Sequence, residues 1–438
     1  MFSDRTNWKL TRNRLTDALE TARSSCASIL DLTVSNPTRA GLRYDEAAIL
    51  RSLSAAQAID YDPQPRGLRP AREAVAAYYG GAHDPGGHST GGLHSFDPEH
   101  LLLTTSTSEG YSYIFRLLCN PGDELLVPKP SYPLFEFLAD LEDVKLVPYP
   151  LIYDHGWQMD FPSLERAVTP RTRGVVVVHP NNPTGSYVQA HELSLLNAFC
   201  RAHGARGHAL ALIADEVFLD YQLDVRTVNV GTVAPSTGSG QAPGSPVERS
   251  STVSPSSTSA VARHPSFTAN QDVLTFTLSG LSKVSALPQM KVAWIAVSGP
   301  PADTAPALAR LEVIADTYLS MNAPLQWATP TLLNQRTSLQ NQLLDRVRGN
   351  LAELDRQLTQ QKTCERLDLE GGWYAILRVP VTKSDEDLAV ELLQQKSVLV
   401  HPGHFYDFPS DGYLVLSLIT PTEDLSEGAN RILNLLNR

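Results

Sequence analysis

The sequence predicts an α/β protein: a large domain with a mainly parallel central sheet flanked by helices, and a smaller α+β domain. Three observations lead to this prediction. Apolar strand-like runs alternate with helical patterns from residue 101 to residue 217, which is typical of a parallel sheet covered on both faces. The chain has 438 residues, enough for a large domain and a smaller one. After residue 300 a long helical stretch precedes separate strands.

The alternation can be followed element by element. A buried strand at 101–105 leads into a helix at 108–119, with Ser108 in its N-cap position. Further strands are expected at 124–130, 145–151, 174–180, 211–217, 273–278 and 292–297, and further helices at 133–142 and 190–203. Ligands of such sheets bind at the carboxyl ends of the strands. The segments expected to meet there follow Thr105, Val178, Ile213 and Leu278.

We assign residues 45–300 to the large domain, and residues 1–44 and 301–438 to the small one. The small domain is expected to contain helices over 301–362 and strands at 373–379, 397–403 and 413–419. Strand-like segments after a helical stretch indicate an α+β arrangement. The N-terminal residues are expected to pack on this domain.

Residues 232–266 interrupt the large domain with a segment rich in Ser, Thr, Pro and Gly. Such a segment cannot offset its ordering entropy by burial, so we interpret it as a disordered surface insertion. A domain linker is the alternative, which the strand-like runs on both sides disfavour.

Composition limits the class of protein. The formal net charge of −11 argues against a nucleic-acid-binding surface. No apolar run reaches the length needed to cross a membrane. The first residues contain no signal-peptide core, although their basic character leaves an organellar address open.

The spacing of the cysteines indicates a reducing compartment, and that of the histidines gives no support to a metal site. The four cysteines form no CxxC pair, so we expect a cytoplasmic protein. His83, His88 and His94 lie close together in HDPGGHSTGGLH. Their Gly-rich setting and irregular spacing favour a polar surface loop over a metal site.

Four segments carry polar side chains at the predicted strand ends. In TTSTSEG (104–110), the hydroxyls of Ser106, Thr107 and Ser108 and the free N–H groups of a helix start form an anion site. In HPNNPTG (179–185), the amide of Asn182 can donate a hydrogen bond into the crevice. Each motif alone is typical of an ordinary helix cap or turn.

The other two segments carry an acid and an amine. Asp215 of ADEVFLDY (214–221) follows a buried strand, where an unpaired carboxylate is costly, so it needs a cationic partner. Lys283 of SGLSK (279–283) lies in a turn between two buried strands, although a solvated lysine is the ordinary interpretation of such a residue alone. The four segments together match what pyridoxal phosphate requires, because a neutral lysine forms an imine with its aldehyde and an acid keeps its ring nitrogen protonated.

The order of these motifs resembles the class I and II aminotransferases, which are pyridoxal-phosphate enzymes of fold type I, over nearly the whole chain. The motifs are TSTSEG, NPGDELLVPKPSYP, HPNNPTG, ADEVFLDY and SGLSK. The resemblance implies that Lys283 is the Schiff-base lysine, that Asp215 pairs with the ring nitrogen, and that Asn182 contacts the ring hydroxyl. It implies further cofactor contacts from Ser106, Thr107, Ser108, Tyr132, Ser282 and Lys291.

Tyr61 of YDPQPRGLRPAREA resembles the tyrosine that reaches the phosphate of a neighbouring subunit, which implies a homodimer with shared active sites. The gap between Asp215 and Lys283 is 283 − 215 = 68 residues. It exceeds the family's usual gap by about the length of the 232–266 segment. This excess supports the interpretation of that segment as an insertion.

Three departures from the family pattern concern the cofactor. Phe218 stands where the family has a tyrosine that bonds the ring oxygen, so that bond is lost. Lys291 stands where the family usually has an arginine on the phosphate, which replaces a bidentate fork by a point charge. Gly280 stands where a serine is common. These changes are expected to weaken cofactor binding without abolishing it.

A fourth departure concerns the substrate. In the motif YLVLSL, Val415 takes the place of the arginine that holds the substrate carboxylate in most members of the family. The substrate-binding candidates are Asn36, Arg378 and His404, the last in the loop HPGHFYDF. Further possibilities, for which a surface or structural role is the ordinary expectation, are Arg39, Arg43 and His401.

The resemblance implies an aminotransferase that moves an amino group between an amino acid and a 2-oxo acid, with Lys283 as the general acid–base. Two alternatives stay open at this point. One is a β-eliminating lyase of the same fold, and the other is a protein that binds pyridoxal phosphate but has lost catalysis. The expected partners are small molecules and a second copy of the chain, with neither nucleic acid nor membrane.

Overall fold

The structure is a computed structural model that describes residues 1–25, 28–80, 96–204, 207–223, 264–319 and 321–437. Several predicted features lie outside these residues. They are all but the last three residues of the 232–266 insertion, the histidines His83, His88 and His94, and Cys26. Among the described residues, no helix is long and apolar enough to span a membrane.

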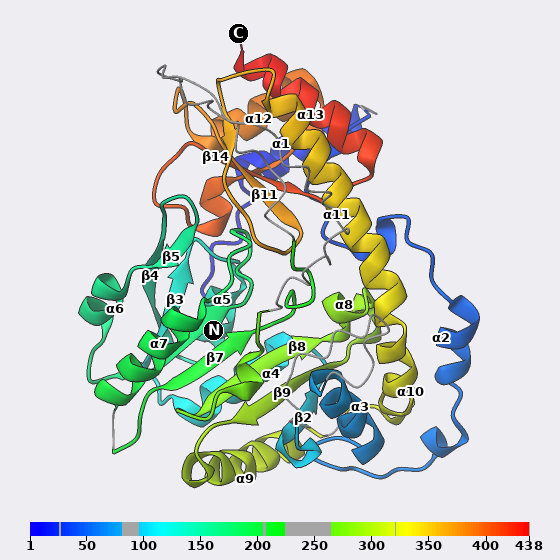
Figure 1. Cartoon of the computed structure of the whole chain (residues 1–438), viewed down its shortest axis with the longest axis vertical. Coiled ribbons are helices and arrows are strands. Elements are labelled where there is room, and N and C mark those ends of the chain that lie inside the picture. Colours follow the sequence, from blue (N-terminus) through cyan, green and yellow to red (C-terminus); the bar gives the residue numbers. More distant parts are fainter. Residues whose placement is uncertain (26–27, 81–95, 205–206, 224–263, 320, 438) are drawn as a thin grey trace, which may run out of the picture.

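An eight-stranded sheet forms the centre of the large part of the molecule (Figure 1). Its strands β8, β7, β6, β3 and β4 run parallel, while β9 and β5 run antiparallel to their neighbours. The predicted mainly parallel sheet is therefore confirmed. In spatial order the strands are β2 (Leu101–Thr104), β9 (Ala293–Ser298), β8 (Thr275–Gly280), β7 (Ala211–Asp215), β6 (Thr172–Val178), β3 (Glu124–Lys129), β4 (Lys145–Tyr153) and β5 (Trp157–Met159).

Helices cover both faces of this sheet. The sequence of β6 shows why both of its faces are buried. Val176 and Val178 pack with α4 (Thr107–Leu118) and α9 (Pro301–Tyr318) on one face. Val175 and Val177 pack with α6 (Phe161–Ala167) and α7 (Ala190–Ala202) on the other. Successive residues of a strand point to opposite faces, so an unbroken valine run is what a strand buried on both sides needs.

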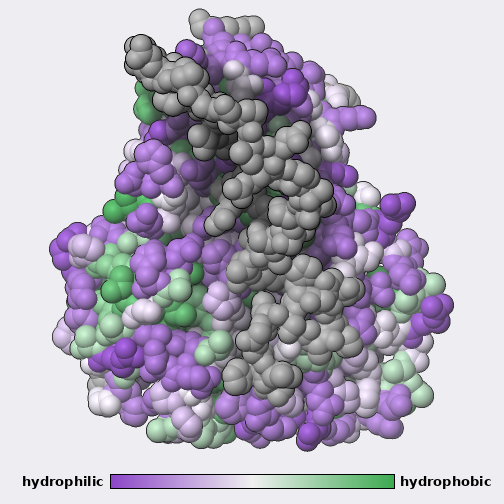
Figure 2. Space-filling view, viewed as in Figure 1, coloured by the Kyte–Doolittle hydropathy of each residue, from purple (hydrophilic) through white to green (hydrophobic). Residues whose placement is uncertain are grey.

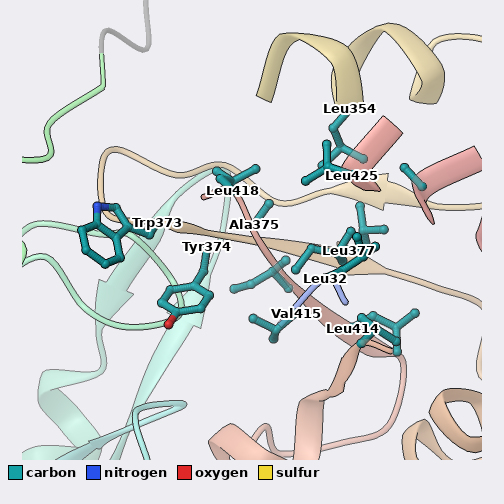
Figure 3. Packing of buried hydrophobic residues seen from close by; sticks show 14 of the residues in the cluster. Leu32, Leu354, Trp373, Tyr374, Ala375, Leu377, Leu414, Val415, Leu418 and Leu425 are labelled. Atoms are coloured by element: carbon teal, nitrogen blue, oxygen red, sulfur yellow. The ribbon is translucent and has the colours of Figure 1, made fainter. Parts of the chain in front are cut away.

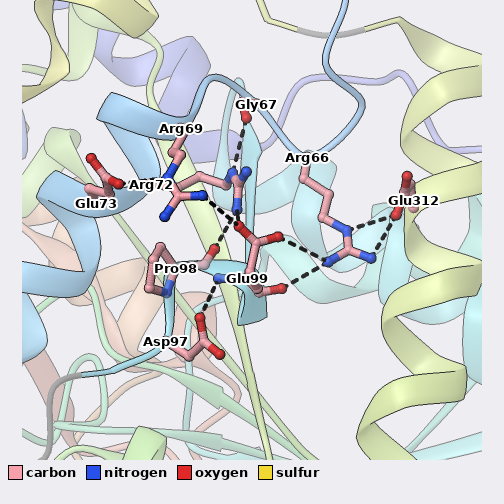
Figure 4. Close-up of polar contacts among 9 residues, drawn as sticks. All are labelled: Arg66, Gly67, Arg69, Arg72, Glu73, Asp97, Pro98, Glu99 and Glu312. Atoms are coloured by element: carbon pink, nitrogen blue, oxygen red, sulfur yellow. Dashed lines mark hydrogen bonds and ion pairs between the residues drawn. The ribbon is translucent and has the colours of Figure 1, made fainter.

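A third layer of packing lies over β2 and β9. It joins α2 (Glu46–Ser52), α3 (Arg69–Tyr79) and α10 (Ala323–Asn334) to the end of the sheet. Figure 4 shows a polar network that holds this corner: Arg72 pairs with Glu99 at 3.1 Å, and Arg66 pairs with Glu312 of α9 at 2.6 Å. Arg72 is buried and also donates to the carbonyl of Gly67 at 3.0 Å. Glu99 lies just before β2. The network therefore stabilises the end of the sheet opposite to the carboxyl ends of the strands, where ligands of such sheets bind.

The smaller part of the molecule is built on a four-stranded antiparallel sheet, in the order β10 (Glu365–Arg366), β11 (Tyr374–Arg378), β14 (Tyr413–Ser417) and β13 (His401–Pro402). A separate parallel pair joins β1 (Leu30–Asp31) to β12 (Val398–Leu399), so the N-terminal segment packs on the C-terminal part. The predicted strand at 397–403 is thus two short strands in different sheets. The helices here are α1 (Arg14–Ser24), α11 (Arg336–Leu358), α12 (Asp385–Lys396) and α13 (Thr422–Leu436).

One apolar cluster fills this part and reaches the larger sheet. In Figure 3, Leu32, Leu354 and Leu425 come together from the N-terminal segment, α11 and α13. Trp373 and Tyr374 point away from this aliphatic group at the start of β11. The cluster also includes Phe218 and Ala286 from the large part. α11 runs from this region down to α8 (Leu281–Val284) (Figure 1), and α5 (Leu134–Leu141) lies beside β4.

The outer face of the molecule seen in Figure 2 is mostly hydrophilic. Apolar side chains gather on its left, over the region of β4, β5, α6 and α7. The short 3-10 helices are η1 (Asp4–Thr6), η2 (Pro37–Arg39), η3 (Ala56–Ile59), η4 (Pro98–His100), η6 (Phe267–Ala269), η7 (Pro288–Met290) and η8 (Gly403–Tyr406).

The structure gives a packing reason for Gly280, where the family often has serine. A Cβ added there would lie 2.9 Å from both the Cβ of Ala293 and the carbonyl oxygen of Val292. Both atoms belong to the neighbouring strand region, which cannot move away without disturbing the ladder between β8 and β9. A hydroxyl-bearing side chain therefore does not fit at this position.

We predict that Gly280→Ala lowers the free energy of unfolding by about 1–3 kcal/mol, because the added methyl group overpacks the junction of β8 and β9. The matched control is Gly349→Ala in α11, where an added Cβ meets nothing within 4 Å. This control should raise stability by about 0.5–1 kcal/mol through helix propensity. Urea unfolding of both variants measures the difference, and equal effects would contradict the packing argument.

Candidate active site

The predicted site lies at the carboxyl ends of the central parallel strands, a region that we call the crevice. β7 lies between β6 and β8, and the strands end in register: Val178 pairs with Asp215, and Asp215 pairs with Leu278. The chain leaves β8 at Gly280 and enters α8, which carries Lys283. Because parallel strands end at one edge of a sheet, the HPNNPTG loop, Asp215 and Lys283 open onto the same crevice.

The Lys283 amine is surrounded by aromatic rings and one carbonyl group. Its Nζ lies 4.8 Å from the ring centroid of Trp373, 5.5 Å from that of Phe218, and 3.5 Å from the carbonyl oxygen of Ser35. Burial lowers the pKa of Lys283 from 10.5 to about 8, and the nearby Asp215 carboxylate offsets only part of this shift. A larger share of the amine is therefore neutral at physiological pH, which is the nucleophilic form.

The pKa of Asp215 is shifted in the opposite direction to that of Lys283. Its oxygens accept hydrogen bonds from the Tyr111 hydroxyl at 3.1 Å and from the Val217 N–H at 3.2 Å. Burial nevertheless raises the pKa of Asp215 from 3.8 to about 6, against the lowering effects of these bonds and of Lys283. The site therefore holds a carboxylate that a further cation would stabilise.

Sequence reasoning missed Tyr111 and Glu216. Tyr111 lies one helical turn after Thr107 in α4, so an i, i+4 pattern would have placed it on the same helix face. Glu216 is buried and accepts hydrogen bonds from the Ser266 hydroxyl at 2.7 Å and the Phe267 N–H at 2.5 Å. It therefore fixes the chain just before η6, and its partners are too distant in sequence to be read from a motif.

Asn182 has a buried polar atom without a partner. The neighbouring Asn181 is used by the loop itself, because its amide donates to the Pro130 carbonyl at 3.0 Å and to the Thr184 hydroxyl at 2.9 Å. The Oδ1 atom of Asn182 makes no hydrogen bond to any described residue. Buried polar atoms are nearly always bonded, so this amide is suited to a ligand.

The N-terminus of α4 differs from the prediction in its cap. The N-cap is Ser106, whose hydroxyl accepts from the Glu109 N–H at 3.1 Å, whereas Ser108 lies within the first turn. β2 ends at Thr104, one residue before its predicted end, and the cap lies two residues before the predicted one. The hydroxyls of Thr107 and Ser108 make no hydrogen bond within the described part of the chain, so both can bind an anion at the helix start.

The remaining residues predicted to contact the cofactor differ in their exposure to solvent. Tyr132 follows β3 with its ring 46% exposed, and burial and the Asp215 charge raise its pKa. Ser282 precedes Lys283 in α8 and is partly buried. Lys291 is exposed at the end of η7, and Tyr61 is 82% exposed in the loop after η3. The contacts of all four residues with the cofactor stay predictions.

The substrate-binding candidates are spread over the small sheet and the N-terminal segment. Asn36 is exposed, follows Ser35 directly, and caps η2 by accepting from the Thr38 N–H. Arg378 forms an ion pair with Glu365. It lies at the far end of β11 from Tyr374, about 13 Å along the strand. The structure thus brings the carbonyl of Ser35, the residue before Asn36, to the Lys283 amine, whereas Arg378 lies at the far end of β11.

Val415 is fully buried in β14, and its neighbour across the strand pair is His401. Directly paired residues share one face of a sheet, so the His401 side chain lies beside the position where the family has its arginine. The His401 Nδ1 bonds the Tyr406 hydroxyl at 3.0 Å. His404 is exposed in η8, and the other two possibilities, Arg39 and Arg43, are exposed as well.

Comparison with known proteins decides the family. The family model for aminotransferase class I and II matches residues 27–432. The chain belongs to the class I and II aminotransferases. The expected resemblance is therefore confirmed, and amino-group transfer is the activity of the family.

Two curated relatives are similar over most of the chain. An alanine aminotransferase of Mycobacterium tuberculosis strain H37Rv is 26% identical over 422 residues, covering 93% of this chain and 85% of the relative. The glutamate-pyruvate aminotransferase AlaA of Escherichia coli K12 is 24% identical over 423 residues, covering 93% of this chain and 90% of the relative. Both names agree with the predicted aminotransferase and give no support to a lyase.

Solved structures of aminotransferases share the fold. An alanine aminotransferase from Pyrococcus furiosus superimposes with a TM-score of 0.79 at 19% identity and full coverage of both chains. An aminotransferase from Escherichia coli gives a TM-score of 0.78 at 22% identity, covering 100% of this chain and 98% of the other. The fold type predicted from the sequence is thus confirmed.

The residues of the crevice fit pyridoxal phosphate, the cofactor of this family. Its charged ring nitrogen suits the Asp215 carboxylate, and its phosphate suits the free hydroxyls at the start of α4. Its ring oxygen suits the Nδ2 group of the Asn182 amide, which can donate a hydrogen bond. Phe218 has no hydroxyl group with which to contact the ring oxygen. Among the described residues, no cluster of side chains could hold a metal ion.

We predict that Asp215→Asn stabilises the protein prepared without cofactor at neutral pH. The folded wild type has a raised pKa of about 6 at Asp215 against an ordinary value of 3.8, so wild-type stability is lost as the pH rises through this window. The Tm advantage of Asp215→Asn should therefore grow from about pH 4 to about pH 6 and stay constant above it. Asp154→Asn, at an exposed turn, controls for the loss of one negative charge, and an equal trend in both variants would contradict the assignment.

Proposed function

We propose that this aminotransferase uses pyridoxal phosphate to move an amino group between an amino acid and a 2-oxo acid, with Lys283 carrying the cofactor covalently. The observation that supports this best is the opposed pair in one crevice: an amine with a lowered pKa and a carboxylate with a raised pKa. An aldehyde and a cationic ring nitrogen would satisfy both groups at once. The pair has no evident purpose in a purely structural role.

The residues of this chain then take separate tasks. Asp215 holds a proton on the ring nitrogen, Asn182 donates its amide to the ring oxygen, and Tyr132 stacks on the ring. Lys283 moves the proton at the substrate Cα as general acid–base. When bound, pyridoxal phosphate supplies the aldehyde that takes up the amino group and a ring that accepts the charge left on Cα. The phosphate-binding residues are Ser106, Thr107, Ser108, Ser282 and Lys291.

A homodimer in the cytoplasm is part of the same proposal. Tyr61 is 82% exposed and Ile59 is 88% exposed in the same loop region, so both are available for contact with a second copy of the chain. Exposed large apolar side chains close together often mark an interface. In such a dimer Tyr61 would reach the phosphate of the partner site.

Alanine, glutamate and pyruvate are the first substrates to test, because the curated relatives are named for them. The carboxylate of such substrates needs a donor other than an arginine at position 415. We propose His401 for this task in preference to His404, since His401 is paired with Val415 across the strands. Its Nδ1 is engaged by Tyr406, while its Nε2 makes no hydrogen bond to a described residue. Asn36, which follows the Ser35 carbonyl that contacts the Lys283 amine, is proposed as a second contact.

Burial lowers the pKa of His401, against the raising effect of Asp31. The imidazole is therefore neutral at physiological pH and acts as a hydrogen-bond donor rather than as a cation. A neutral donor binds a carboxylate less tightly than a bidentate guanidinium. We therefore expect a weaker affinity for the amino-acid substrate than an arginine at position 415 would provide.

The experiment that tests the function is borohydride reduction of the purified protein followed by peptide mapping. The wild type is expected to absorb visible light and to retain the cofactor on Lys283, whereas Lys283→Ala should be colourless. Lys145→Ala is the control, because Lys145 is exposed on β4 and pairs with Glu124. Label on a different lysine would contradict the proposal. Release of ammonia and pyruvate without an acceptor would indicate the lyase instead.

We predict that His401→Leu raises the KM for alanine about tenfold or more, because leucine cannot donate the hydrogen bond to the charged carboxylate. The visible absorbance of the bound cofactor should not change. His404→Leu is the matched comparison and should leave KM within about twofold, as expected for an exposed side chain. Steady-state kinetics with pyruvate or another 2-oxo acid as acceptor gives the comparison. A rise in KM for His404→Leu alone would assign the carboxylate contact to the loop instead.

A further inference from the structure

The turn that follows Lys283 has an unusual backbone. Ala286 has φ +52°, in the left-handed region that L-residues other than Asn and Asp rarely adopt. It is fully buried, and no glycine relieves the conformation. Such strained positions persist only where the surroundings impose them, and they concentrate at functional sites.

Three side chains impose this conformation by donating hydrogen bonds to carbonyl groups of the turn. The Tyr221 hydroxyl donates to the carbonyl of Lys283 itself at 2.7 Å. The Gln340 amide donates to the carbonyl of Val284 at 2.8 Å, and the Tyr44 hydroxyl donates to that of Ala286 at 2.9 Å. The Lys283 carbonyl also accepts from the Ala286 N–H at 3.2 Å. α8 has only four residues, so the carbonyls of Val284 and Ala286 have no following helical turn to bond them.

The three donors are themselves fixed. Tyr221 is fully buried and packs edge-on against Trp373, with ring centroids 4.9 Å apart. The Gln340 amide also donates to Asp220 at 2.7 Å, where the Tyr78 hydroxyl donates as well, at 3.0 Å. Burial raises the pKa of both donor tyrosines, that of Tyr44 to about 12. Both hydroxyls therefore keep their protons at any working pH.

The donors come from different parts of the chain. Tyr221 follows β7 in the large part of the molecule. Tyr44 lies in the segment before α2, and Gln340 lies near the start of α11, which extends to the smaller sheet (Figure 1). The bonds of Tyr44 and Gln340 span 242 and 56 residues of sequence. Elements outside the central sheet therefore determine where the backbone of Lys283 lies.

We propose that Tyr44, Tyr221 and Gln340 are positioning residues for Lys283, which lock the turn at 283–286 so that the amine points into the crevice between Trp373 and Asp215. The role of this arrangement in catalysis rests on the proposed function, whereas the three hydrogen bonds that hold the turn do not depend on it. Without the three bonds the strained turn relaxes, and the Lys283 amine samples orientations away from the crevice. Capture of an aldehyde then slows, because only the aligned amine reacts.

The test compares Tyr221→Phe and Gln340→Met with a matched control, Tyr149→Phe. The Tyr149 hydroxyl is fully buried and donates to the Val176 carbonyl at 2.8 Å, so this control loses the same kind of bond away from the turn. The first readout is the rate at which pyridoxal phosphate and cyanoborohydride label Lys283, followed by peptide mass spectrometry. The second is hydrogen exchange of the amides of Ser285, Ala286 and Leu287, which bond within the turn.

We expect labelling of Lys283 to slow about tenfold or more in Tyr221→Phe and Gln340→Met, as misalignment of a reacting group does. The turn amides should exchange faster in these variants. The Tyr149→Phe control should match the wild type in both readouts while its Tm falls. Labelling at the control rate together with unchanged exchange would overturn the proposal.

A replacement variant and an independent readout cover two cases in which the labelling experiment alone would not decide. If Tyr221→Phe does not fold, Tyr44→Phe replaces it, because the Tyr44 ring is only partly buried. If the wild type carries its label on another lysine, the proposed function fails. The exchange of the turn amides then judges the positioning by itself: faster exchange in the variants supports it, and wild-type exchange overturns it.

Discussion

The structure depends on one electrostatic constraint, which is the placement of a partly buried carboxylate and a partly buried amine at the carboxyl ends of neighbouring parallel strands. Burial shifts the pKa of Asp215 upward and that of Lys283 downward, so each group loses part of the charge that would stabilise the other. Without a ligand this desolvation costs free energy. A ligand that is cationic at one end and carries an aldehyde at the other removes the cost, and this is the chemistry of the aminotransferase cofactor.

The surrounding fold serves to hold this pair. The register of β6, β7 and β8 sets Asp215 one strand away from the turn that carries Lys283. Tyr111 of α4 bonds the carboxylate, and Trp373 of the smaller part lies against the amine. Each contact comes from a different layer, so the two parts of the molecule meet at the reactive groups. Val415 takes no part in these contacts, and we propose that it changes only how a substrate is held.

Much of this could be predicted from the sequence, for identifiable reasons. The valine run of β6 predicts a strand buried on both faces because period and composition agree, and the motif order identifies the family. The cap of α4 was assigned to Ser108 instead of Ser106 because three small hydroxyl residues suit the position equally, and the end of β2 decides among them. The bonds of Tyr44 and Gln340 to the lysine turn could not be predicted, since their partners are remote in sequence. The pairing of His401 with Val415 likewise depends on strand register, which no local motif specifies.

We propose that Lys283 and Asp215 enclose one cofactor between them. The decisive measurement is a crystal structure of the protein grown with pyridoxal phosphate. We expect continuous density from the Lys283 Nζ to the cofactor, with the ring nitrogen at hydrogen-bonding distance from the Asp215 carboxylate. A Lys283 amine directed into bulk solvent, or an Asp215 carboxylate paired with another side chain while the cofactor binds elsewhere, would contradict it.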